Sequence, residues 1–104
     1  ANVSMFKAKD NPIYHALGEV NPEAIIFPEF NSAFVGLGVN NAKTVAVYDW
    51  NAVVALMVHE QDMKPTEARE FLYLNVISQC NSDNAPLFLQ QTNPMREIEQ
   101  LFFM

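Results

Sequence analysis

The chain has few of the residues from which metal sites, disulfides and nucleic-acid interfaces are built. Its 104 residues include one cysteine, two histidines, and six lysines and arginines in all. Because Cys80 is the only cysteine, no intramolecular disulfide can form, and we expect a cytoplasmic protein from a reducing compartment. The longest mostly apolar run, residues 52–58, is far shorter than the roughly 20 residues of a membrane-spanning helix, so we expect no membrane association.

Acidic charge dominates and is concentrated in the second half of the chain. The formal net charge is −6, and residues 46–104 hold eight of the twelve acids but only three of the six bases. Binding to a phosphate backbone needs clustered lysines and arginines, so we expect no nucleic-acid partner. Mimicry of DNA would need rows of acids, yet no two acids are adjacent. The charge is compatible with a basic protein partner.

Length and composition indicate a single globular domain, residues 1–104. Half of the residues are hydrophobic and 17% are charged, which is unlike the composition of a disordered chain. We divide the domain into an irregular N-terminal segment, residues 1–29, a core, residues 30–91, and a C-terminal helix, residues 93–104. Within the first segment, Pro12 is placed to open a short helix that Gly18 ends.

Two strands and a turn are predicted at the start of the core. Residues 33–39 alternate glycine with large apolar side chains, residues 40–43 have turn chemistry, and residues 44–48 are rich in β-branched and aromatic residues. This order predicts an antiparallel hairpin. Gly36 and Gly38 leave one face of the first strand without side chains, and we expect a helix to pack there.

Two helices and a third strand follow the hairpin. Asp49 is placed to cap a helix from Trp50, whose apolar residues recur at helical spacing, and Thr66 to cap a second helix that runs to about Gln79. A short strand at residues 86–89 closes the unit. The sequence therefore predicts an α+β fold of order ββααβ, in which a small antiparallel sheet packs on two helices, with a C-terminal helix added.

The C-terminal helix has an apolar face that needs a surface to cover it. Asn93 and Pro94 have the signature of a helix start, and an isolated helix of about eleven residues is marginally stable. Its face either docks on the domain's own core or contacts another chain, a partner or a second copy, and both alternatives stay open. Aromatic and methionine side chains suit an interface, and the predicted interface residues are Ile98, Leu101, Phe102, Phe103 and Met104.

Four runs in the core resemble a group of small uncharacterised proteins encoded by bacteriophages and prophages. These runs are AFVGLG, VAVYDWNAVVALM, EAREFLYLNV and APLFL, and the match covers a little over half of the chain. The chain departs from the group's pattern at Asp62-Met63, where Gly-Met is usual, at Tyr73-Leu74-Asn75, and at Ala85-Pro86, where Thr-Pro is usual. The resemblance implies a viral setting, hence a host cytoplasm, and no established activity.

No catalytic or metal motif is complete. His59-Glu60 resembles the start of a zinc-protease helix, but the second histidine that this site requires is replaced by Met63. A metal site would have to draw distant segments together, and its candidate ligands are His15, His59, Cys80 and Asp83. Cys80 beside a histidine would make a nucleophile pair, but no third orienting group can be named. We therefore predict no metal, no cofactor and, on balance, no enzyme.

Three further features bear on function. The glycines around Leu37 lack the third glycine of a phosphate loop. The paired helices resemble a helix-turn-helix, but the second offers Arg69 against two glutamates and so disfavours DNA. Asn75 lies in an apolar run, where its amide either bonds loop or strand-end backbone, and so fixes how the second helix docks, or faces a ligand.

Two functional hypotheses follow. The first is a non-enzymatic phage-type interaction protein that binds and modulates a host protein, such as a defence factor, and that also self-associates. The alternative is a small-ligand-binding or weakly catalytic domain with a pocket between the hairpin and the helices. The residues predicted to line that pocket are Gly36, Tyr48, Trp50 and Asn75.

Overall fold

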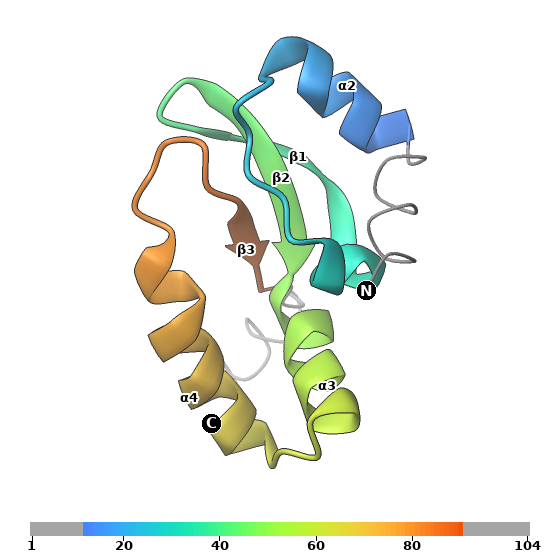
Figure 1. Cartoon of the computed structure of the whole chain (residues 1–104), viewed down its shortest axis with the longest axis vertical. Helices are drawn as coiled ribbons and strands as arrows, with labels where there is room; N and C mark the ends of the chain where they lie inside the picture. The colour runs from blue at the N-terminus through green and yellow to red at the C-terminus, as the bar shows by residue number, and fades with distance from the viewer. Residues whose placement is uncertain (1–11, 91–104) are drawn as a thin grey trace, which may run out of the picture.

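The computed structural model describes residues 12–90. In chain order the elements are α2 (Pro12–Val20), η1 (Pro28–Ala33), β1 (Phe34–Asn40), β2 (Lys43–Asp49), α3 (Trp50–Glu60), α4 (Pro65–Asn75), η2 (Ile77–Gln79) and β3 (Leu87–Leu89) (Figure 1). The α+β class and the ββααβ order are confirmed. The predicted C-terminal helix and its interface residues lie outside the described residues. Within residues 12–90, none of the helices has the length and apolarity to cross a membrane.

The sheet is mixed, with strand order β1-β2-β3. β1 and β2 pair antiparallel as predicted, but β3 pairs parallel to β2, with Tyr48 opposite Phe88. The prediction of a wholly antiparallel sheet is therefore wrong for its third strand. Parallel neighbours need a long crossover connection, which α3 and α4 supply by carrying the chain away from the sheet and back. A strand's apolar pattern does not indicate its direction.

The hairpin turns over two residues, Asn41 and Ala42, whose φ angles are +50° and +69°. Positive φ at both central residues is the property of the type I′ turn, whose twist matches that of the flanking strands. At the other end of the hairpin the register shifts between Phe34 and Gly36, and Gly36 has a φ of +153°. The hairpin therefore carries an irregularity where β1 leaves η1.

The predicted cap of α3 is confirmed, whereas that of α4 is wrong. The side chain of Asp49 accepts a hydrogen bond of 3.3 Å from the backbone N–H of Ala52. In α4, Pro65 occupies the first turn, so Lys64 is the N-cap residue and Thr66 lies inside the helix. The α-helical part ends at Asn75, and the 3-10 turn η2 continues to Gln79, the predicted end.

The N-terminal segment contributes to the core more than its prolines and asparagines indicate. α2 extends to Val20 and includes Gly18, so this glycine does not end it. Tyr14 and Leu17 point inward from α2 and join the same cluster as residues from η1, β2, α3 and α4. Buried members of that cluster are Tyr14, Leu17, Phe30, Ala33, Ala46, Tyr48, Trp50, Val53, Val54, Ala68 and Leu72.

The bare face of β1 lies against neighbouring strands, not against the helix that we expected. A Cβ atom on Gly38 would lie 2.7 Å from Cγ2 of Val47 and 3.3 Å from Cδ1 of Leu87. Nothing lies within 4 Å of the corresponding position on Gly36. The glycine at position 38 therefore makes room for side chains of β2 and β3 on one face of the sheet.

Asparagines hold the loop that precedes β3. The amide of Asn21 donates to the carbonyl oxygen of Thr44 at 2.9 Å and to Oδ1 of Asn84 at 3.0 Å. The carbonyl of Asn84 in turn accepts from the backbone N–H of Ile25 at 2.9 Å. Asn41, in the hairpin turn, donates to Oδ2 of Asp83 at 3.0 Å. These bonds anchor the loop to the hairpin and to the N-terminal segment, and so they position β3.

Candidate binding groove

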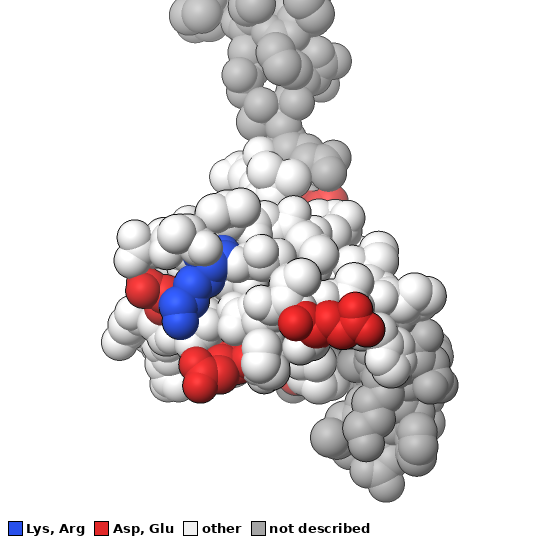
Figure 2. Space-filling model, turned by 90° about the horizontal axis from the view of Figure 1, so that it is seen from above, with Lys and Arg blue, Asp and Glu red and all other residues white. Residues whose placement is uncertain are grey.

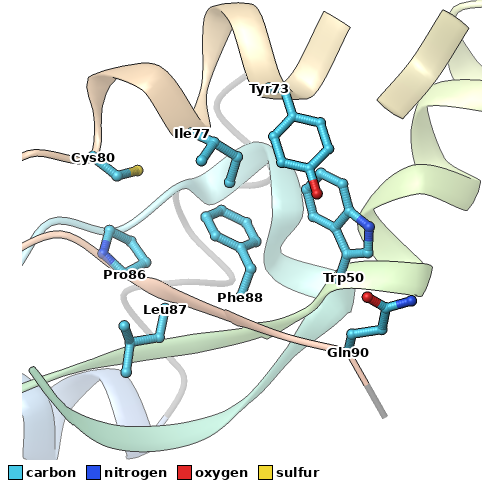
Figure 3. Close-up of a pocket in the computed structure, with 8 residues that line it drawn as sticks. All are labelled: Trp50, Tyr73, Ile77, Cys80, Pro86, Leu87, Phe88 and Gln90. Carbon is cyan, nitrogen blue, oxygen red and sulfur yellow. The ribbon is translucent and has the colours of Figure 1, made fainter. Parts of the chain in front are cut away.

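An open cavity of about 320 Å³ lies between β3 on one side and α4 with η2 on the other. Figure 3 shows its lining side chains. They are Trp50, Tyr73, Ile77, Cys80, Pro86, Leu87, Phe88 and Gln90. We call this cavity the β3–α4 groove. Most of its lining is aromatic or aliphatic, and none of the described residues that line it is charged.

One wall of the groove comes from a stripe along α4 and η2. Tyr73 lies in α4, Ile77 begins η2 and Cys80 directly follows η2, and all three line the groove. Ala68 and Leu72 belong to a neighbouring stripe and are completely buried in the core. The apolar surface of α4 is therefore wider than the core requires, and the excess faces the groove.

The opposite wall is an edge strand. β3 pairs with β2, and within residues 12–90 no strand pairs with its other side. Phe88 lies opposite Tyr48 and shares its face of the sheet, whereas Leu87 lies opposite Val47 on the other face. Leu87 is 36% exposed and Leu89 is 46% exposed. The groove thus runs beside a strand edge that has exposed leucines.

Aromatic rings join the two walls. Trp50, at the start of α3, has its ring centroid 5.2 Å from that of Tyr73 and 5.9 Å from that of Phe88. The ring planes of Trp50 and Phe88 meet at 84°, an edge-to-face arrangement that aromatic pairs favour. Figure 3 shows the rings of Trp50 and Tyr73 together at one end of the groove, with Phe88 next to them in its middle. Trp50 is 6% exposed, so its ring is packed between α4 and β3 at the bottom of the groove.

The groove also holds polar groups with unused hydrogen-bonding capacity. Three side-chain groups make no hydrogen bond with another residue in the described part of the chain. They are the indole N–H of Trp50, the hydroxyl of Tyr73 and the side-chain amide of Gln90. An apolar lining with a few open donors and acceptors is the usual composition of a binding site.

The thiol of Cys80 is not activated. It donates a hydrogen bond of 3.3 Å to the carbonyl oxygen of Val76, and burial raises the pKa of the thiol. The reactive form is the thiolate, so a raised pKa lowers its reactivity at neutral pH. His15 and His59 are exposed residues of α2 and α3, and neither lines the groove. The structure therefore does not place a histidine beside Cys80 in the groove, as a nucleophile pair would require.

One of the four predicted pocket residues, Trp50, lines the groove. Tyr48 is buried inside the core, where its hydroxyl lies 3.0 Å from that of Tyr14. Gly36 belongs to β1, on the far side of β2 from β3. Asn75 is exposed, and its amide donates to the carbonyl oxygen of Phe71 in its own helix, so neither reading of its role from the sequence applies.

The sequence contains one signal that would have located the groove. The spacing of Tyr73, Ile77 and Cys80 marks a second apolar stripe beside that of Ala68 and Leu72. In the described part of the chain, no group of three or more histidine, cysteine, aspartate or glutamate side chains is arranged to hold a metal ion.

The surface charges do not mark a second site on the face that Figure 2 shows. The acidic and basic side chains there are scattered over a mostly uncharged surface, and no basic patch is visible.

The chain matches no protein-family model, no curated protein and no solved structure. The functional argument therefore rests on the geometry of the β3–α4 groove.

Proposed function

We propose that this protein is a non-enzymatic interaction protein, which binds an apolar segment of another polypeptide in the β3–α4 groove. The observation that carries the proposal is the combination of an aromatic, uncharged groove with an unpaired strand edge. An extended peptide can pair with such an edge through its backbone, while its side chains enter the neighbouring apolar groove.

The surroundings of the groove support a polypeptide ligand. Tyr73, which lines the groove, is 57% exposed, and Leu89, next to the groove on β3, is 46% exposed. Aromatic residues in a partly covered groove are typical of the positions that dominate binding energy at protein interfaces. The open hydrogen-bonding groups of Tyr73 and Gln90 are suited to peptide amides.

The nature of the partner is proposed from sequence. The resemblance to phage-encoded proteins favours a protein of the bacterial host, such as a defence factor, met in the host cytoplasm. The net charge of −6 favours a partner whose surface around the bound segment is basic. Self-association through the same surface belongs to this proposal.

The test uses two matched substitutions in α4. Tyr73→Asp places a charge in the groove, whereas Leu74→Asp places the same charge on the next residue, which is more exposed and does not line the groove. Each tagged protein is recovered from bacterial lysate, and its bound mass is measured by native mass spectrometry. We expect a bound polypeptide with the natural sequence and with Leu74→Asp, and at least a tenfold loss with Tyr73→Asp, since tenfold corresponds to about 1.4 kcal/mol.

Equal loss in both variants would contradict binding through the groove. Retention of the polypeptide by Tyr73→Asp would contradict it as well. Circular dichroism of both variants establishes whether each keeps its fold.

The cavity volume favours one alternative, a small apolar ligand. A volume of about 320 Å³ falls at the lower end of the range that small-molecule sites occupy. An aromatic compound between Trp50 and Tyr73 would be recovered as an adduct of small mass, and it would quench the fluorescence of Trp50. A flat fluorescence response across a panel of nucleotides and metabolites, together with a bound polypeptide, would exclude this function.

A further inference from the structure

We propose that the apolar segment at residues 93–104 of the same chain occupies the β3–α4 groove in the free protein and competes there with the partner. The competition rests on the proposed function, whereas the docking does not. Three observations support docking: where the segment begins, which side chains it carries, and how long it is.

The segment begins at the groove. Gln90 is the last residue that the structure describes, and it is itself part of the groove lining. Only residues 91 and 92 separate it from the segment. A tether this short holds the segment at an effective concentration in the millimolar range, so modest affinity is enough for occupancy. Asn93-Pro94 has the turn chemistry needed to redirect the chain back along β3.

The side chains of the segment match the groove in polarity. Met95, Ile98 and Phe102 are spaced at i, i+3 and i+7, which is one face of a helix, and Leu101 widens that face. Among the charged residues of the segment, Arg96 and Glu97 fall off this face, and Glu99 lies at its edge beside Met95. The groove has no charged lining and presents three aromatic rings. The centre of the apolar face, Ile98 and Phe102, would therefore enter the groove while Glu99 stays at its open rim.

The lengths also agree. At about 3.3 Å per residue, the strand wall from Pro86 to Gln90 is about 13 Å long. A helix over residues 94–104 would be about 16 Å long at 1.5 Å per residue. One apolar face of the segment is thus long enough to cover the groove. A second copy would have to supply the same segment without the tether, so we assign the groove to the chain's own segment.

The protein contains two natural reporters of the groove. Trp50 and Cys80 are the only tryptophan and the only cysteine of the chain, and both line it. Phe102→Asp introduces a charge on the apolar face of the segment, and Gln100→Asp introduces the same charge off that face. The rate of Cys80 alkylation by iodoacetamide and the quenching of Trp50 by acrylamide are measured on the full chain.

We expect Phe102→Asp to raise the alkylation rate by about tenfold or more, which is the change produced by losing one well-packed aromatic anchor. Acrylamide quenching should increase as well, and Gln100→Asp should behave like the natural sequence. Ile98→Asp is a second variant on the same face and should repeat the result. Thermal unfolding followed by circular dichroism establishes that each variant remains folded.

Two results would overturn the proposal. If Phe102→Asp and Ile98→Asp leave both reporters unchanged, the segment does not cover the groove. If protection of Cys80 falls on dilution and native mass spectrometry shows two chains, the occupant comes from a second copy. Failure of the proposed function can be distinguished from failure of the docking, because the Cys80 and Trp50 reporters need no partner. If the protein binds no partner but Cys80 remains protected, the proposed function is refuted and the docking of residues 93–104 stands.

Discussion

The hydroxyl groups of Tyr14 and Tyr48 lie 3.0 Å apart in the core, and this bond joins α2 to β2. The Tyr48 hydroxyl also accepts a hydrogen bond of 2.8 Å from the backbone N–H of Phe27. A buried N–H without an acceptor is costly, so the Tyr48 hydroxyl stabilises the packing of the N-terminal segment on the sheet.

Tyr48→Phe should destabilise the protein by about 1–3 kcal/mol, because it leaves the N–H of Phe27 without its acceptor. Tyr14→Phe should cost less, about 0.5–1.5 kcal/mol, since Tyr48 keeps its bond to Phe27. Tyr73→Phe is the control, with a change within about 0.5 kcal/mol, because Tyr73 is exposed. Urea unfolding measures all three. A larger loss for Tyr14→Phe than for Tyr48→Phe would contradict this assignment.

Stability should fall as the pH rises above about 10. Burial raises the pKa of Tyr48 and that of Tyr14 above the ordinary value of 10.0. The unfolded chain then loses these protons first, so the folded state binds more protons and is disfavoured as the pH rises. Each tyrosine adds a slope of up to about 1.4 kcal/mol per pH unit. Unfolding of Tyr48→Phe between pH 9 and 11 should show a shallower slope, and an identical slope would refute this cause.

Ala42→Gly should stabilise the hairpin by about 1 kcal/mol. Ala42 has a φ of +69°, and a side chain with a Cβ atom is strained in that region, whereas glycine is not. Asn41→Gly should gain less, because asparagine tolerates the left-handed region better than alanine does. Thermal and urea unfolding compare the two variants. A loss of stability in Ala42→Gly would show that chain entropy outweighs the strain.

Asp49→Ala should cost about 0.5–2 kcal/mol, because it removes the acceptor for the N–H of Ala52 at the start of α3. Asp49→Asn keeps an acceptor oxygen and should change stability by less than about 0.5 kcal/mol. Thr66→Ala should also be nearly neutral, since Lys64 is the N-cap residue of α4. If Thr66→Ala costs as much as Asp49→Ala in chemical unfolding, the start of α4 is assigned wrongly.

Gly38→Ala should destabilise the sheet by about 1–3 kcal/mol, because the new methyl group would overlap Val47 at 2.7 Å. Gly18→Ala is the matched change in α2, where nothing lies within 4 Å of the added atom. It should stabilise the protein by up to about 1 kcal/mol through helix propensity. Calorimetric melting temperatures should therefore move in opposite directions, and a shared direction would contradict the packing at Gly38.

Features with local causes were predictable from the sequence. The order ββααβ follows from changes of apolar period, the hairpin turn from Asn40 to Lys43 follows from turn chemistry, and the cap of α3 follows from Asp49. Each depends on residues within a few positions of one another. The wrong cap for α4 has a local cause too, since Pro65 is favoured in the first helical turn and displaces Thr66 from the cap position.

Features that join distant segments were decided by the tertiary structure alone. The parallel direction of β3, the bond between Tyr14 and Tyr48, and the close approach of Leu87 to Gly38 each link segments separated by more than 30 residues. The β3–α4 groove is of the same kind, because Trp50, Tyr73 and Phe88 meet only after the crossover has returned the chain to β2. An apolar pattern records that a side chain is hidden from water, but it does not record which neighbour hides it. Short-range physics therefore determined the elements, and the packing of those elements determined the groove.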